Sequence, residues 1–276
     1  MVSKGAGYGK VILFGEHFVV YGLPAIASAI SSRTIAIVKR TEKPGWDLTD
    51  DRPAIPGYKK KKLDEQRVSI ENILRFAEID TSQEGIHITL EGDLVCASGI
   101  GASAASCVAL ARALNEEFNL GWDDHKVNAA AYEGERGYHG TPSGIDNTAS
   151  TFGGVVWYKR DLDGGPPTIE TIKLKSPTEI VIASTGITAS TAEVVADVRQ
   201  MKEEKTKWFD QIVKDYMEIA DTGRKGLEEM ELQLLGSLMN KNHKLLIEIS
   251  VSCNELEELV GVARQAGAWG AKLTGT

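Results

Sequence analysis

The feature that most constrains this chain is the serine- and glycine-rich segment 98–106 (SGIGASAAS), which apolar residues at helical spacing follow directly. Gly99 and Gly101 lack side chains, which allows a tight turn and a close approach of the backbone to a bulky group. The helix behind the turn presents free N–H groups and a partial positive charge, and these favour a phosphate. The segment therefore predicts a phosphate-binding turn, although a simple strand-to-helix turn explains it equally well.

This segment differs from the two most familiar phosphate-binding motifs. No glycine-lysine-serine or glycine-lysine-threonine run follows it, as the Walker motif requires. Its glycines also lack the spacing of the dinucleotide-binding fingerprint. If phosphate binds here, the sequence predicts a different nucleotide-binding fold.

Periodicity divides the chain into a mixed first part and a helical second part. Helical patterns cover 68–77, 103–120 and 125–136, and from 191 to about 266 the pattern is helical, with breaks expected at Gly223, Gly226 and Gly236. The runs that predict strands are 11–14, 18–21, 25–30, 33–38, 85–94, 151–158, 169–174 and 179–184. Residues 41–62 are polar and rich in proline and lysine, which predicts an exposed irregular loop. We therefore expect an α+β protein with two lobes, residues 1–186 and 187–276.

Charge and cysteine content exclude several classes of protein. The net charge of −8 argues against nucleic acid as the main partner. The cysteines, Cys96, Cys107 and Cys253, are odd in number and lack CxxC spacing, which disfavours a disulfide framework and a zinc site. No apolar run is long enough to cross a bilayer, and Lys4 and Lys10 interrupt the N-terminal apolar residues, unlike in a signal peptide. We therefore expect a cytoplasmic protein.

Two further groups of polar residues flank predicted strands. Lys10 precedes the apolar run 11–14, and Glu16 and His17 follow it at a glycine turn, which is typical of an edge that faces a ligand. A surface lysine and a structural hydrogen-bonded Glu16–His17 pair are the alternatives. Residues 184–191 lie where a strand meets a helix, so they either cap that helix or line an acceptor pocket.

The segment 133–147 contains two carboxylates that can carry chemistry. Glu135 lies near the end of a predicted helix, and Asp146 lies on a glycine-punctuated loop. A magnesium ion that carries ATP needs only one or two protein oxygens, which Glu135 and the Ser103 hydroxyl can supply. Asp146 can accept the proton of an alcohol, although an Asx turn with Asn147 also explains it. A phosphate turn, two carboxylates and a lysine together indicate a phosphoryl transferase.

Three segments, in this order, resemble the GHMP small-molecule kinases. Residues 9–22 (GKVILFGEHFVVYG), 98–106 and 134–147 (GERGYHGTPSGIDN) are similar to the first motif, the phosphate loop, and the metal and base segment of that family. Gly7 and Tyr8 replace the usual alanine and proline before the first motif, and Ala102 replaces a more common serine. Within the superfamily the resemblance is closest to the mevalonate kinases. It implies a two-lobed α+β fold with the active site in the cleft between the lobes.

The resemblance also implies roles for individual residues. Asp146 is then the catalytic base, Lys10 contacts Asp146 and the transferred phosphoryl group, and Ser103 and Glu135 bind Mg²⁺. The residues expected to bind ATP are Ala97, Ser98, Gly99, Ile100, Gly101, Ala102 and Ser103. The residues expected to bind the substrate are Lys10, Glu16, His17, Ser143, Gly144, Asp146 and Thr191.

The activity implied is ATP-dependent phosphorylation of the C5 hydroxyl of (R)-mevalonate in isoprenoid biosynthesis, by an enzyme that is commonly a homodimer. The nearest alternatives within the superfamily are kinases for phosphomevalonate, the 3-hydroxyl of mevalonate, homoserine or a sugar, and a decarboxylase that first phosphorylates a tertiary hydroxyl. A non-catalytic ligand sensor is an alternative of a different class. An RNA-binding domain of similar topology is disfavoured by the acidic charge balance.

The last residues, 272–276 (KLTGT), are similar to the start of the family's third motif. The glycine loop, the strand and the helix that follow in the family do not follow here. We therefore expect this sequence to be a fragment of a longer protein or to omit its remainder.

Overall fold

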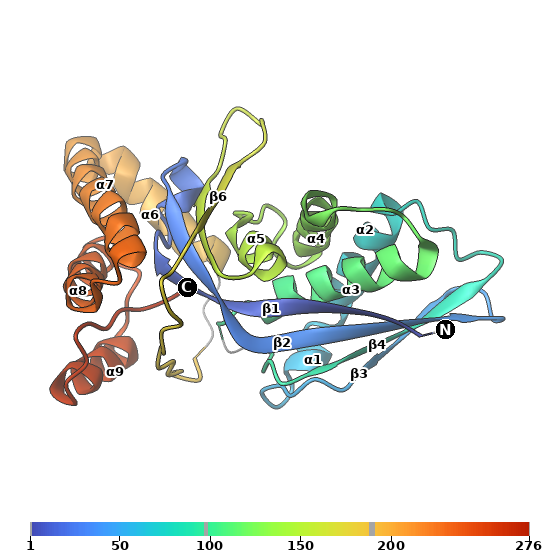
Figure 1. Ribbon diagram of the computed structural model, residues 1–276. Coiled ribbons are helices and arrows are strands. Elements are labelled where there is room, and N and C mark those ends of the chain that lie inside the picture. Colours follow the sequence, from blue (N-terminus) through green and yellow to red (C-terminus); the bar gives the residue numbers. More distant parts are fainter. Residues whose placement is uncertain (1, 97–98, 188–190, 276) are drawn as a thin grey trace. The chain divides into compact units, whose positions relative to one another are not determined.

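The computed structural model describes residues 2–96, 99–187 and 191–275 (Figure 1). Its elements confirm the α+β class, because strands and helices alternate in the first part and only helices occur after residue 190 in the described chain. No helix among the described residues combines the length and the apolar character needed to cross a membrane. In chain order the elements are β1 Ser3–Phe14, η1 Val19–Tyr21, β2 Ala25–Thr41, β3 Trp46–Asp50, α1 Tyr58–Lys61, α2 Leu63–Phe76, β4 Gly85–Gly92, α3 Ala102–Phe118, α4 Asp124–His139, α5 Ile145–Phe152, β5 Val155–Lys159, β6 Thr168–Ile172, α6 Thr191–Glu204, α7 Thr206–Glu229, α8 Leu232–Glu248 and α9 Asn254–Gln265.

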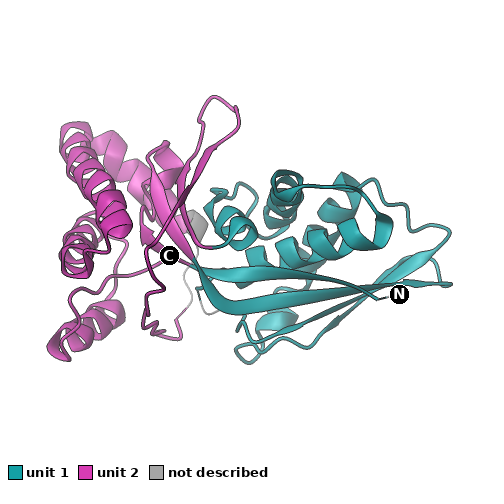
Figure 2. Cartoon of the chain, in the orientation of Figure 1, with its two compact units in different colours: residues 1–10, 29–153 teal, residues 11–28, 154–276 magenta. Residues whose placement is uncertain are grey.

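The chain forms two compact units (Figure 2). Unit 1 consists of residues 1–10 and 29–153, and unit 2 consists of residues 11–28 and 154–276. Strands β1 and β2 each contribute residues to both units, so neither unit is one continuous stretch of sequence. The division into lobes at residue 186 and the cleft between the lobes remain predictions.

Unit 1 packs a sheet against helices. Strand β2 pairs antiparallel with β4 over residues 34–41 and 85–92, and β3 pairs parallel with β4 at the edge. Alternate residues of β2 and β4 point into a core that α2, α3 and α4 complete. Its fully buried members include Val38, Ile73, Ile88, Leu110 and Leu114.

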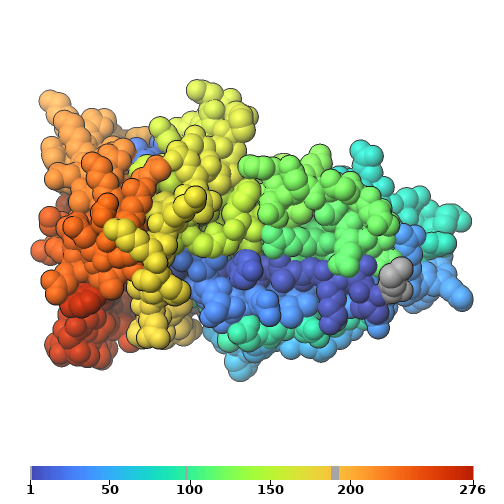
Figure 3. All heavy atoms as spheres, in the orientation of Figure 1, coloured from blue at the N-terminus to red at the C-terminus, as the bar shows by residue number. Residues whose placement is uncertain are grey.

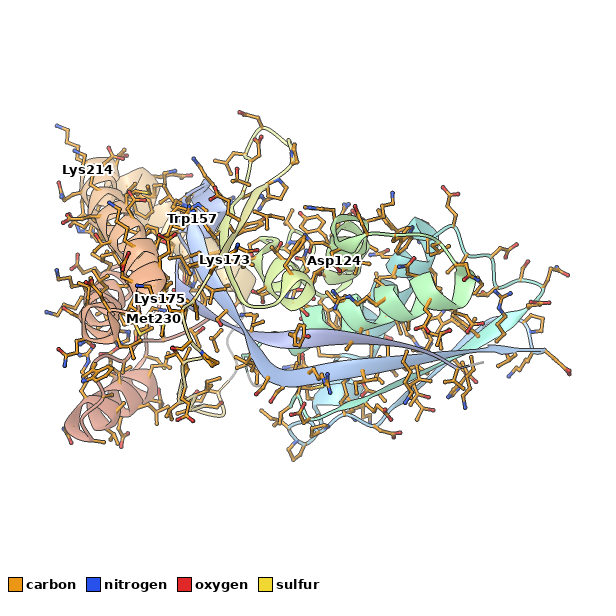
Figure 4. The ribbon with its side chains drawn as sticks, in the orientation of Figure 1. Asp124, Trp157, Lys173, Lys175, Lys214 and Met230 are labelled. Atoms are coloured by element: carbon orange, nitrogen blue, oxygen red, sulfur yellow. The ribbon has the colours of Figure 1, made fainter. Side chains whose placement is uncertain are left out.

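Unit 2 packs a smaller part of the sheet and the helices α6 to α9 around aromatic residues. The first residues of β2 pair antiparallel with β5, and β5 pairs antiparallel with β6. Tyr216 of α7 is buried, its ring stacks on Phe18 at 4.0 Å, and its hydroxyl donates to the Pro24 carbonyl at 2.5 Å. The Arg224 guanidinium lies 5.1 Å from the ring centre of Trp157 on β5, which is labelled in Figure 4.

Several of the predicted elements in the first part differ in the structure. The first two residues of the predicted strand 151–158 belong to helix α5, and strand β5 covers Val155–Lys159. The predicted strand 18–21 is instead the short helix η1, Val19–Tyr21, because the Tyr21 N–H donates to the Phe18 carbonyl and Gly22, at φ +73°, closes the turn. The two predicted strands 25–30 and 33–38 are one strand, β2. The expected loop 41–62 contains the edge strand β3, which is stabilised by parallel pairing with β4, and the short helix α1.

The prediction also failed at two places in the second part. Residues 179–184 form no strand, since no strand of the described chain pairs with them, and Val181 is 96% exposed. The three glycines expected to break helices lie inside α7 and α8, where they allow close packing. A Cβ at Gly223 would lie only 3.0 Å from the ring of Phe14.

Strand β1 lies directly on the backbone of α3, and alternating glycines make this possible. A Cβ on Gly7 would lie 2.2 Å from the Ala105 carbonyl oxygen, and one on Gly5 would lie 2.2 Å from that of Ala109. In Figure 3 the dark blue atoms of β1 lie beside the green atoms of the helices. Any side chain at these positions would force the strand away from the helix that begins at the serine-glycine turn.

We predict that Gly7→Ala lowers the free energy of unfolding by about 2 kcal/mol or more, because the added methyl meets backbone that cannot move aside. The control is Gly261→Ala on α9, where the new Cβ has no neighbour within 4 Å. That variant should be neutral or more stable by up to about 1 kcal/mol. Urea midpoints at constant slope measure both, and equal midpoints would contradict the proposed contact.

Candidate active site

The site is built around an ion pair between Lys10 of β1 and Asp146 of α5. The Lys10 side chain is only 3% exposed, and its Nζ lies 3.2 Å from Asp146 Oδ2. Asp146 occupies the first turn of α5 and is 30% exposed, so it faces both the lysine and solvent. A buried ammonium requires a charged partner, and here a carboxylate from a distant part of the sequence supplies it.

The alternative of an Asx turn between Asp146 and Asn147 is not what the structure shows. The Asn147 amide donates instead to Asn128 Oδ1 at 2.7 Å and is buried. Asn147 thereby fixes α5 to α4, and the Asp146 carboxylate turns toward Lys10.

The serine-glycine turn contacts the same lysine. The Lys10 N–H donates to the Ile100 carbonyl at 2.9 Å. Gly101 has φ +77°, and a Cβ there would lie 2.8 Å from Lys10 Cγ. Both the backbone angle and the close approach therefore require glycine at this position. Helix α3 begins directly behind the turn, with Ser103 in its first turn. Ala97 and Ser98 lie outside the described residues.

Glu135 completes the group and is almost entirely buried, at 1% exposed. Burial raises the pKa of its carboxyl to about 8, and the negative charge of Asp146 acts in the same direction. A hydrogen bond from Ser103 and the charge of Lys10 partly oppose this rise. His139 Nε2, one helical turn later on α4, lies 3.9 Å from Glu135 Oε2.

These residues fit a divalent cation that is shared with a phosphate. Among the described residues there is no group of three or more histidine, cysteine, aspartate or glutamate side chains that could hold a metal by themselves. Magnesium bound with a nucleotide needs fewer protein ligands, because the phosphates and water supply the rest. A cation beside Glu135 and the Ser103 hydroxyl would relieve the cost of ionising a buried carboxylate next to Asp146.

The predicted site residues divide between the two units. Unit 1 brings together Lys10, the turn 99–103, Glu135, Ser143, Gly144 and Asp146. Glu16, His17 and Thr191 belong to unit 2. Thr191 begins α6, and its side chain lies outside the described part of the chain.

Glu16 and His17 both lie buried in unit 2. Glu16 forms an ion pair with Lys272, and both side chains are at most 4% exposed. His17 has φ +61°, and burial lowers the pKa of its ring to about 4, so the ring is neutral. Neither ring nitrogen of His17 has a hydrogen-bond partner among the described residues. A neutral imidazole whose two nitrogens have no partner can accept a hydrogen bond from a polar ligand or donate one to it.

Sequence reasoning missed two side chains that support this machinery. In the sequence Lys272 is only part of the terminal segment 272–276, but in the structure it forms an ion pair with Glu16, 256 residues away. Arg52 lies in the segment expected to be an irregular loop, but its guanidinium donates to the Ala102 carbonyl at 3.2 Å. No local pattern indicates either interaction, because each depends on which segments the fold brings together.

Comparison with known proteins gives a consistent result along the chain. The model for the GHMP kinases N terminal domain matches residues 68–154, and that for the GHMP kinases C terminal matches residues 224–276. The mevalonate kinase of Thermococcus sibiricus is 33% identical over 96% of this chain and 84% of its own length. The mevalonate kinase of Candida albicans is 28% identical over 97% of this chain and 77% of its own length.

Solved structures agree with these relatives. The crystal structure of L. major mevalonate kinase in complex with R-mevalonate has a TM-score of 0.91 and 45% identity, and it covers 99% of this chain and 83% of that one. Lactococcus lactis galactokinase, with 20% identity and a TM-score of 0.72, covers 99% of this chain and 82% of that one, and it shares the fold.

The buried Glu135 carboxyl predicts a pH dependence of stability in metal-free buffer. Its pKa is raised from 4.5 to about 8 in the folded state, so the folded protein holds a proton that the unfolded chain has released. Stability is therefore highest below about pH 4.5 for this group and falls as pH rises toward 8. We expect Glu135→Gln to remove this loss, which amounts to up to about 4 kcal/mol.

Urea midpoints at about pH 5 and about pH 8.5 measure this effect. The control is Glu133→Gln on the same helix, a more exposed glutamate that pairs with Arg136. Parallel pH profiles for wild type and Glu135→Gln would show that Glu135 ionises normally.

Proposed function

The chain belongs to the mevalonate kinase family of GHMP kinases, and we propose that it transfers the γ-phosphoryl group of ATP to the C5 hydroxyl of (R)-mevalonate in isoprenoid biosynthesis. The observation that carries the proposal is the Lys10–Asp146 pair beside the turn 99–103, in a chain related to mevalonate kinases over nearly its whole length. The L. major relative, at 45% identity, was crystallised with R-mevalonate.

We assign Asp146 the role of general base. Its carboxylate is partly exposed, so a bound hydroxyl group can reach it, and the Lys10 ammonium 3.2 Å away holds it in position. We assign it the proton of the C5 hydroxyl as the new P–O bond forms. The position of the substrate hydroxyl relative to Asp146 contributes most to the rate, because a hydroxyl already bound within hydrogen-bond distance of the base loses little further entropy in reaching the transition state.

Lys10 and the turn stabilise the negative charge of the phosphates. The ammonium group is nearly excluded from water, so its attraction for the transferred group is weakly screened. The glycines of the turn and the first N–H groups of α3 receive the phosphate oxygens in the proposed complex. Mg²⁺, which Ser103 and Glu135 would bind, supplies further neutralisation of the β- and γ-phosphates when present.

The acceptor side of the proposal rests on residues of both units. Ser143 and Gly144 directly precede α5, and Glu16, His17 and Thr191 come from unit 2. We infer that these residues contact mevalonate. The homodimer that the family resemblance implies remains a prediction.

The test of the function is ADP release with a panel of alcohols. Galactokinase and homoserine kinase share this fold at 20% and 18% identity, so the fold alone does not select the acceptor. We expect release with (R)-mevalonate and not with phosphomevalonate, homoserine or galactose. Phosphorus NMR of the product distinguishes the 5-phosphate from the 3-phosphate. ATP binding without turnover for any alcohol would indicate a ligand sensor.

Asp146→Asn is the sharpest test of the proposed mechanism. The amide preserves size but accepts a proton poorly, so we expect kcat to fall by about 10³-fold. The dissociation constant for ATP should stay within about threefold of wild type, because the nucleotide is assigned to other residues. Glu133→Gln is the matched control. Turnover by Asp146→Asn near the wild-type rate would exclude Asp146 as the base.

A further inference from the structure

One buried arginine connects the segment 50–62, which runs from the end of β3 to the start of α2, with the phosphate turn. Arg52 is 5% exposed. Its Nε and Nη2 donate to the two carboxylate oxygens of Asp50 at 3.0 and 2.6 Å, and its Nη1 donates to the Ala102 carbonyl at 3.2 Å. Ala102 is the first residue of α3 and is adjacent to Ser103.

Asp50 is held just as firmly as Arg52. The Gln66 amide donates to Asp50 Oδ2 at 2.8 Å, and Lys59 Nζ donates to the Asp50 carbonyl at 2.6 Å. Burial alone would raise the pKa of this carboxyl, but the hydrogen bonds and charges of Arg52, Gln66 and Lys59 lower it to about 2. The pair therefore stays ionised at neutral pH, and its geometry is fixed from several sides.

The same segment also contacts the chain before the turn. The Cys96 N–H donates to the Pro53 carbonyl at 2.8 Å, and the Ile55 N–H donates to the Cys96 carbonyl at 3.4 Å. Segment 50–62 thus contacts Cys96 on one side of the turn and Ala102 on the other. One segment therefore contacts both a residue before the turn and the first residue of α3.

The charge balance explains why this arrangement needs both partners. The start of a helix carries partial positive charge, so a lone guanidinium there would be repelled. Asp50 cancels that repulsion, and the planar guanidinium retains an N–H for Ala102 while two others contact the carboxylate. A lysine ammonium cannot present three donors in this fork geometry.

We propose that Arg52, which Asp50 holds in place, is a positioning residue that fixes the start of α3 so that the turn and the Ser103 hydroxyl are set for the phosphates of ATP. This rests on the proposed function, in which residues 97–103 bind the nucleotide. Arg52 acts through the backbone of Ala102 and has no assigned contact with either substrate. Its loss should therefore weaken the use of ATP while the affinity for mevalonate is unchanged.

The experiment compares Arg52→Lys and Asp50→Asn with wild type in steady-state assays. We expect the KM for ATP to rise about tenfold in each, the cost of one charge-assisted hydrogen bond, while the KM for mevalonate stays within about twofold. The double variant should resemble either single one, since both disrupt the same unit.

The matched control is Arg112→Lys, because Arg112 lies on α3, the helix whose first residue accepts from Arg52, but away from the turn. Arg112 donates to the carbonyls of Ala6 and Thr151 at 2.8 Å each and to Asp124 at 2.7 Å (Asp124 is labelled in Figure 4). The Arg112→Lys variant should be less stable than wild type but have the same KM for ATP. An equal rise in that KM for Arg112→Lys, or no rise for Arg52→Lys and Asp50→Asn, would overturn the proposal.

Two further outcomes also test the proposal: a variant that does not fold, and a wild type that does not phosphorylate mevalonate. If Arg52→Lys does not fold, the KM for ATP of Asp50→Asn alone tests the positioning role. If neither variant folds while Arg112→Lys does, the positioning role is overturned. Calorimetry can measure ATP binding without an acceptor alcohol, so it tests the positioning role of Arg52 separately from the proposed mevalonate kinase activity. A wild type that binds ATP but phosphorylates no mevalonate contradicts the proposed function only, and ATP affinity then takes the place of KM.

Discussion

The ion pair between Lys10 and Asp146 is the interaction on which the rest of the site depends. An ammonium that is 3% exposed is stable only beside its carboxylate, and the carboxylate is presented by a helix more than a hundred residues away. The turn at Ile100 and Gly101 closes on the stem of the same lysine. The turn 99–103 and the Asp146 carboxylate therefore meet at the buried Lys10 side chain, which contacts both of them.

The glycines of this chain illustrate how much of the fold a sequence can predict. The prediction of a turn at Gly99 and Gly101 is confirmed by their positive φ angles, and it was possible because two glycines directly before a helical pattern are a local sequence signal. Gly5 and Gly7 carry equal structural weight, but their purpose depends on the backbone of α3, about a hundred residues away. Gly223 and Gly236 were interpreted as helix breaks, although they only make room for neighbours in space. Local conformation was predictable, and the packing partner was not.

The same limit applies to the side chains of the candidate site. Lys10, Ser103, Glu135 and Asp146 stand in motifs, so a resemblance can point to each of them. Arg52 and Lys272 stand in no informative pattern, and their importance follows from a buried charge that faces a carbonyl or a carboxylate. Strand β3 and residues 179–184 show this dependence for the backbone as well. A strand persists where a partner ladder exists, as for β3 on β4, and not where the described chain offers none.

The ion pair of Lys272 with Glu16 has a consequence for how the protein is made. Synthesis proceeds from the N-terminus, so Glu16 leaves the ribosome long before Lys272, which lies 256 residues later, has been added. The Ile12 N–H likewise lacks its native acceptor, the Thr274 hydroxyl at 2.8 Å, over the same interval. The nascent chain can fold much of unit 1 early, but the second half of β1 acquires these partners only after all the helices of unit 2 have been synthesised. Unit 2 is therefore completed later than unit 1.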